Sequence, residues 1–148
     1  MLRGLKLLTW GILINYSMLI GTMIFFVGVV SPSAISTLTG DYLSSFLRAI
    51  FPKMFLMGLL FGIIGTTLIY FIEQPLVLLS SGFINLSFLI NLLIITPKIN
   101  AIRDEECLDE NVRERKFKIY HGFSILLFVT NFALSGFIIL LTLLWLTS

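Results

Sequence analysis

The chain has 148 residues, of which 57% are hydrophobic and only 12% are charged, and its mean hydropathy is +1.02. Soluble domains are about half apolar and about a quarter charged, so this composition excludes a soluble globular core. The formal net charge is only +2, and the basic residues do not form a stripe, so nucleic-acid binding has no support. We therefore expect an integral membrane protein whose main partner is the lipid bilayer.

Four apolar segments without a carboxylate or a lysine fill most of the chain. They cover approximately residues 7–30, 54–72, 76–96 and 119–146. Each is about as long as a bilayer-spanning helix, which needs about 20 residues. The first is too long for the apolar region of a signal peptide, which has about 7 to 15 residues. The sequence predicts an all-α integral membrane fold, a single four-transmembrane-helix bundle over residues 1–148.

The two longer connections differ in character. In residues 32–51, apolar side chains recur at helical spacing, with Ser31 as a helix cap and Pro32 in the first turn, so we predict an interfacial amphipathic helix broken at Gly40. Residues 98–118 carry six basic and six acidic residues, which predicts solvated extensions of the third and fourth spans with a turn near residues 108–111. All four prolines lie at edges of the apolar segments, where we expect helices to begin or end: Pro32, Pro52, Pro75 and Pro97.

The distribution of basic residues predicts an orientation. With four spans, both termini lie on one side, with Arg3 and Lys6, and both longer connections lie on the other side, with the remaining eight of the ten basic residues. The positive-inside rule then places the longer connections in the cytoplasm and both termini outside it, although the basic N-terminus argues for the opposite orientation. The membrane is expected to be a bacterial inner membrane or its equivalent.

Several kinds of chemistry lack the residues they need. The spans hold no ionisable group at mid-bilayer for a proton relay, and no G-x-x-x-x-G-K loop exists for an ATPase. His121 is the only histidine and Cys107 the only cysteine, which is too few for a zinc site, a paired haem ligation or an intrachain disulfide. We expect no cofactor, no metal site and no recognisable catalytic residues, so an enzyme is disfavoured.

A group of polar residues at the cytoplasmic ends of the third and fourth spans is the candidate binding site. Its members are Lys98, Asn100, Arg103, His121, Ser124 and Asn131. The three on the fourth span share one helix face at spacings of three and seven. The functional interpretation is a pocket with Lys98, Arg103 and His121 at its rim. The alternative is that these side chains bond between helices, with Arg103 paired to Asp104 or Glu106 and Lys98 extended to the interface.

Two further patterns have a functional and a structural interpretation. Gly58 and Gly62 form a G-x-x-x-G pattern, which is more typical of close packing within a bundle than of a dimer interface. The intramembrane methionines Met18, Met23, Met54 and Met57, with Cys107, suggest a soft-metal ligand set, but methionine is also a common filler of irregular apolar space.

Several motifs give the chain a family resemblance. They are GTMIFFVGVVSP at residues 21–32, FPK followed by a phenylalanine at 51–55, PKINAIRD at 97–104, and FK with HGFS at 117–124, followed by Asn131. With these motifs the chain resembles the transmembrane protein 205-like family, a group of small four-span membrane proteins of unknown function. The resemblance implies a four-helix membrane fold and no known reaction.

The expected function is the binding or passage of a small solute or a soft-metal species, in a homo-oligomer, since one small bundle has little room for a path. An anionic lipid is a further candidate ligand. Two other classes stay open. One is a structural or assembly protein of the inner membrane that docks partners on the charged hairpin of residues 98–118. The other is a membrane enzyme that acts on an amphiphile through Lys98, Arg103 and His121.

Overall fold

The computed structural model describes residues 2–105, 107 and 109–147, and its regular elements are all helices. In chain order they are α1 (Leu2–Phe25), η1 (Phe26–Val30), α2 (Ser31–Thr37), α3 (Gly40–Tyr70), α4 (Pro75–Ile90), η2 (Asn91–Ile95), α5 (Thr96–Asp104) and α6 (Glu110–Thr147), where η denotes a π-helical turn.

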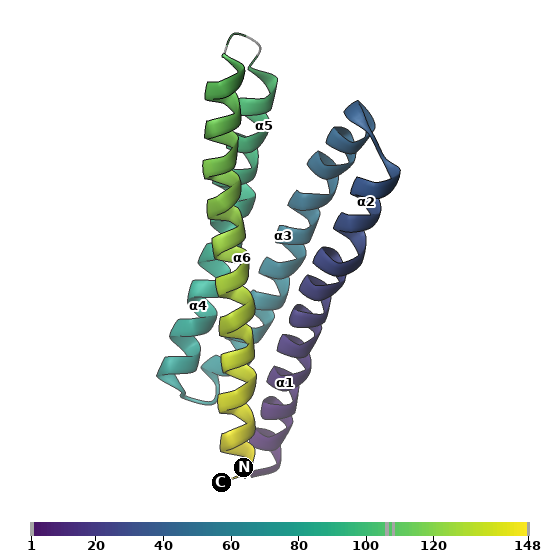
Figure 1. Cartoon of the computed structure of the whole chain (residues 1–148). Helices are drawn as coiled ribbons and strands as arrows, with labels where there is room; N and C mark the ends of the chain where they lie inside the picture. The colour runs from purple at the N-terminus through teal and green to yellow at the C-terminus, as the bar shows by residue number, and fades with distance from the viewer. Residues whose placement is uncertain (1, 106, 108, 148) are drawn as a thin grey trace.

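These elements join into four long rods, which confirms the predicted four-helix membrane fold. The rods cover residues 4–37, 40–70, 75–104 and 110–146, and each is long and apolar enough to cross a bilayer. They run alternately up and down, so that both termini lie together at one end and the α2–α3 and α5–α6 connections lie at the other (Figure 1). The two longer connections therefore share one end of the molecule, as the sequence predicts.

Two of the rods contain a π-helical turn just ahead of a proline. The N–H of Ser31 bonds to the carbonyl of Phe26, and the N–H of Thr96 bonds to that of Asn91, each five residues earlier. Pro32 and Pro97 follow directly. A proline ring clashes with the carbonyl four residues before it, and a wider turn relieves that clash without ending the helix. The expectation that these prolines mark helix ends is therefore wrong.

Of the other two prolines, one lies inside a helix and the other begins one. Pro52 lies inside α3, contrary to the expectation that it marks a helix boundary, whereas Pro75 does begin α4.

The structure differs from the sequence-based prediction at residues 32–51. They form no separate helix, because α2 continues the first rod to Thr37 and α3 begins at Gly40. The break at Leu38 and Thr39 lies next to the predicted position, and Gly40 has a φ of 56°, which glycine adopts without strain. The amphipathic segment is thus the tip of a helical hairpin.

A similar hairpin tip joins α5 to α6. The connection runs between Asp104 and Glu110, slightly earlier than predicted, and Leu108 lies outside the described residues. Lys118 and Glu114, four residues apart on α6, form an ion pair at 2.7 Å.

The four rods pack as a ring in which α1 contacts α3 and α6, and α4 contacts α3 and α6. Across the middle of this ring, Tyr16 donates a hydrogen bond to Ser81, at 2.7 Å. Glycines of α3 allow this packing, because a Cβ at Gly65 would lie 2.7 Å from the Tyr16 ring and one at Gly58 would lie 2.5 Å from Phe88. The G-x-x-x-G pattern therefore serves close packing within the bundle, as predicted.

Candidate functional site

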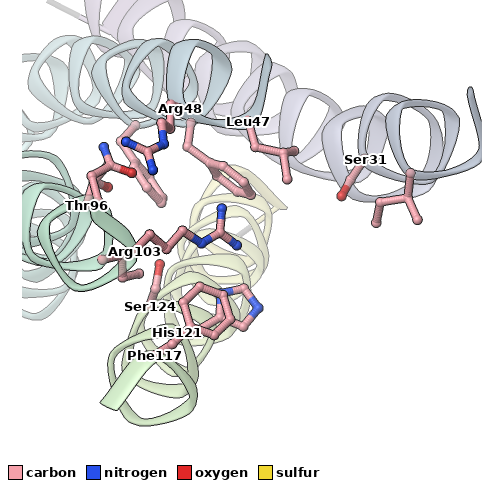
Figure 2. Close-up of a pocket in the computed structure, with 13 residues that line it drawn as sticks. Ser31, Leu47, Arg48, Thr96, Arg103, Phe117, His121 and Ser124 are labelled. Atoms are coloured by element: carbon pink, nitrogen blue, oxygen red, sulfur yellow. The ribbon is translucent and has the colours of Figure 1, made fainter. Parts of the chain in front are cut away.

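The two hairpins diverge toward the end that carries their tips (Figure 1). A cavity of about 220 Å³ lies between them, and Figure 2 shows its lining residues. The first hairpin contributes α2 and α3, and the second contributes α5 and α6. The lining residues are Ser31, Ile35, Leu47, Arg48, Phe51, Phe55, Thr96, Ile99, Asn100, Arg103, Phe117, His121 and Ser124. We call this cavity the arginine cleft.

Arg103 is the central charged group of the arginine cleft. Figure 2 shows its side chain reaching from α5 into the space between Arg48 and His121. The guanidinium lies over the ring of Phe117, with its carbon 4.5 Å from the ring centre. Among the described residues it forms no ion pair or hydrogen bond, although the side chain is half-buried. Burying a charge without a partner is costly, and the Arg103 guanidinium has no acidic partner among these residues to offset that cost.

Arg48 joins the two hairpins across the top of the cleft. Its two terminal nitrogens lie 2.6 and 2.8 Å from the two carboxylate oxygens of Asp104, in a bidentate pair between α3 and α5. Asp104, one of the two acids predicted to pair with Arg103, is therefore paired with Arg48 instead. The other candidate, Glu106, lies outside the described residues. Two guanidinium groups and one carboxylate leave the cleft net positive. The positive charges of Arg48 and Arg103 also act on each other.

The fourth span supplies the opposite wall. The His121 ring stacks on Phe117, with centroids 5.4 Å apart and planes 12° apart, and it lies within the electrostatic influence of Arg103. The Ser124 hydroxyl donates to Oδ1 of Asn91, at 2.7 Å, and the amide of Asn91 donates to the carbonyl of Ser87, at 3.3 Å. The serine hydroxyl is therefore bonded away from His121, and the two are not arranged as nucleophile and base.

Four of the six predicted site residues meet in the arginine cleft: Asn100, Arg103, His121 and Ser124. The other two lie elsewhere. Lys98 is exposed, with its ammonium 5.5 Å from the centre of the Tyr120 ring. Asn131 lies two turns beyond Ser124 on α6 and is fully buried. Neither polar atom of its side chain has a partner among the described residues.

Sequence reasoning missed the contribution of the first hairpin. Arg48, Phe51 and Phe55 line the cleft, whereas the sequence predicts an interfacial helix for the first two and the second span for Phe55. The signal was available, because four spans place residues 31–53 and 97–118 at the same end of the bundle. Sequence reasoning also missed a second polar cluster inside the bundle, in which Ser81 bonds to both Tyr16 and Thr66, and Asn85 donates to Thr66 at 2.8 Å.

The proposed soft-metal ligands do not form one group. Met18 and Met57 are 54% and 45% exposed on the outside of the bundle, whereas Met23 and Met54 are both buried in its core. Cys107 is exposed at the α5–α6 tip. Within the described part of the chain, no group of three His, Cys, Asp or Glu side chains could hold a metal ion.

A second cavity, of about 340 Å³, adjoins the arginine cleft on the side toward the middle of the bundle. The two share the wall residues Ser31, Phe51, Phe55, His121 and Ser124. The remaining lining is entirely apolar and comes from η1, α3 and α6: Phe26, Val27, Met54, Ile125, Phe128 and Val129. We call this cavity the apolar chamber.

Comparisons with known proteins show a family. No curated protein and no solved structure matches the chain. A family described as a domain of unknown function, DUF4149, matches residues 14–107. The match covers more than half of the chain and includes α3 and α5, which contribute Arg48 and Arg103 to the cleft. The chain therefore belongs to the DUF4149 family of domains of unknown function.

Proposed function

We propose that this membrane protein binds a small anionic solute, or an anionic group of a larger molecule, in the arginine cleft. The observation that carries the proposal is the half-buried guanidinium of Arg103, which faces the cavity without an acidic partner among the described residues. Arg48 lies on the same cavity, so an anion there would meet two guanidinium groups.

The geometry suits phosphate or carboxylate better than other anions. A guanidinium presents a planar fork of N–H donors that bonds two oxygens at once, and Phe117 holds the Arg103 fork in place by stacking. Asn100 supplies a neutral amide on the same wall. Each charge-assisted hydrogen bond of this kind is worth about 1.5–3 kcal/mol, so loss of the Arg103 fork should reduce affinity about tenfold or more.

Several finer features form part of the same proposal. Passage of the solute requires a homo-oligomer, because the described bundle is packed across its middle at Tyr16 and Ser81. The basic-residue count supports an inner membrane with both termini outside the cytoplasm. The motifs at 97–104 and 117–124 support a relationship with the transmembrane protein 205-like family.

The structure favours this proposal over the two other classes. An enzyme acting through His121 would need an activated nucleophile, and the neighbouring Ser124 bonds to Asn91 instead. An assembly protein would dock partners on the α5–α6 tip, but its charged side chains are mostly exposed to solvent and need no partner to offset burial. The arginine cleft, in contrast, presents a half-buried charged group that needs a partner.

Inorganic phosphate is the probe for the proposed site. The protein is purified in a neutral detergent, and its thermal unfolding midpoint is measured with and without phosphate, because a ligand that binds only the folded state raises that midpoint. The variants are Arg103→Gln and Arg103→Lys, and the control is Arg115→Gln, which removes the same charge from an exposed position on α6.

The expected result is a phosphate-dependent rise in the wild-type protein and in Arg115→Gln, no rise in Arg103→Gln, and a much smaller rise in Arg103→Lys, which keeps the charge but loses the fork. An equal rise in all four proteins would mean that phosphate does not bind at Arg103, and the proposal would then be wrong.

A further inference from the structure

The arginine cleft and the apolar chamber lie side by side and share five wall residues, so together they offer a charged end and an apolar end. Arg48 and Arg103 lie at the charged end, while Phe26, Met54 and Phe128 lie at the apolar end. A small soluble anion would fill only the charged end. The chamber, at about 340 Å³, would then stay without an occupant beside it.

The two ends lie at the depths that an amphiphile needs. The apolar chamber is built by the first and fourth apolar segments and the start of the second, which belong in the hydrocarbon layer. Arg103 lies seven residues beyond the last residue of the third segment, at position 96, a rise of about 10 Å along a helix. That distance places its guanidinium at the level of lipid headgroups, where a phosphate is normally found.

The chamber also has an opening toward the bilayer. Val27 of η1 and Ile125 and Val129 of α6 line it, and these side chains are 54%, 50% and 56% exposed. All three lie in apolar segments, so this side of the chamber faces lipid rather than water. An acyl chain could enter sideways between the first and fourth rods without leaving the membrane.

Resting on the proposed function, we propose that the natural ligand of the arginine cleft is an anionic lipid, whose phosphate is held by Arg103 and Arg48 and whose acyl chain lies in the apolar chamber. The charge of the cleft selects an anionic headgroup over a zwitterionic one, because a fixed positive charge beside the phosphate would be repelled by Arg48 and Arg103. The lipid-facing opening selects a membrane lipid over a soluble anion.

Binding of phosphatidylglycerol to the purified protein tests this inference, with phosphatidylcholine as the zwitterionic comparison and inorganic phosphate as the anion without a chain. Lipid bound per protein is counted by native mass spectrometry after release from a neutral detergent. Arg103→Gln removes the charged end. Val129→Trp fills the apolar chamber, and Leu140→Trp is its control, since Leu140 is equally exposed on α6, at 55%, and does not line the chamber.

We expect phosphatidylglycerol to bind about tenfold more tightly than phosphatidylcholine, and both Arg103→Gln and Val129→Trp to remove that preference while Leu140→Trp retains it. Phosphate binding that depends on Arg103, with lipid binding unaffected by Val129→Trp, would overturn the lipid assignment and leave the anion site standing. Binding of both lipid and phosphate that is unaffected by Arg103→Gln would overturn both.

Discussion

Individual polar side chains inside the bundle differ sharply in how well they are satisfied. Asn91 is fully buried, accepts a hydrogen bond from Ser124 and donates one to the Ser87 carbonyl. Asn131 is equally buried, and its amide has no partner among the described residues. An unpaired buried amide costs free energy, whereas a paired one contributes to stability.

Replacing each asparagine by leucine should therefore have opposite effects on stability. Asn131→Leu should leave the free energy of unfolding unchanged or raise it by about 1 kcal/mol, and Asn91→Leu should lower it by about 1–3 kcal/mol because Ser124 loses its acceptor. Unfolding in a denaturing detergent titration measures both. Equal losses in the two variants would mean that Asn131 has a partner, such as a bound water.

The charge on Asp104 sets the electrostatic balance of the cleft. Asp104 neutralises Arg48 through a bidentate contact, and both side chains are partly exposed, at 58% and 33%. Removing the carboxylate leaves the positive charge of Arg48 uncompensated, so that both guanidinium groups attract the ligand in full. Asp104→Asn should therefore tighten phosphate binding severalfold at low salt and less at high salt, because exposed charges are screened. Isothermal titration at two salt concentrations checks this, and weaker binding in the variant would contradict it.

Among the elements, α3 depends most on glycine. A Cβ at Gly65 would lie 2.7 Å from the ring of Tyr16, which is fully buried and fixed by its bond to Ser81. A Cβ at Gly82 of α4, in contrast, would meet nothing within 4 Å among the described residues. The same substitution at the two sites thus separates packing from intrinsic helix preference.

Gly65→Ala should lower the free energy of unfolding by about 1–3 kcal/mol because α1 must move away from α3. Gly82→Ala should leave it unchanged or raise it slightly, since alanine favours a helix by about 1 kcal/mol over glycine. Denaturing detergent titration compares the two variants. A Gly65→Ala protein as stable as Gly82→Ala would show that the contact between Gly65 and Tyr16 is not tight.

The sequence predicted these elements better than their ends. Long uncharged segments have one stable form in a bilayer, which is why four helices follow from hydropathy alone. The helix boundaries predicted at Pro32, Pro52 and Pro97 are wrong because the helix continues through each proline, after a π turn at Pro32 and Pro97 and within α3 at Pro52. Both π turns end in the same sequence pattern, two β-branched residues followed by Ser or Thr and then Pro, as VVSP and IITP. This repeat is the feature of the sequence that could have indicated the two π turns.

The sequence predicts the part of the candidate site on the third and fourth spans but not the part on the first hairpin. Asn100, Arg103, His121 and Ser124 lie on adjacent spans joined by a short turn, so their meeting follows from chain connectivity. Arg48 joins them only because its side chain reaches from the first hairpin to Asp104 of the second and pairs with it. Such contacts between hairpins depend on tertiary packing, which spacing along one helix does not encode.

Across the whole molecule, the two hairpin tips lie at one end and both termini at the other (Figure 1). The single cysteine, Cys107, is exposed at the α5–α6 tip and is therefore a natural reporter of which side that tip faces. The basic-residue count predicts a cytoplasmic tip.

A membrane-impermeant maleimide should therefore label Cys107 in inverted membrane vesicles and not in intact cells. Cys107→Ser is the control for non-specific labelling. Strong labelling in intact cells, blocked by Cys107→Ser, would reverse the orientation and place the arginine cleft on the outer side of the membrane.

The central claim is that the arginine cleft holds an anion between two guanidinium groups. The most direct measurement is a crystal structure of the protein grown with selenate, whose selenium gives an anomalous signal that locates the anion. We predict a peak within hydrogen-bond distance of the Arg103 guanidinium, on the side that faces Arg48. A cleft without a selenate peak, with peaks only at exposed basic residues such as Lys116 and Lys118 of the α5–α6 tip, would contradict the claim.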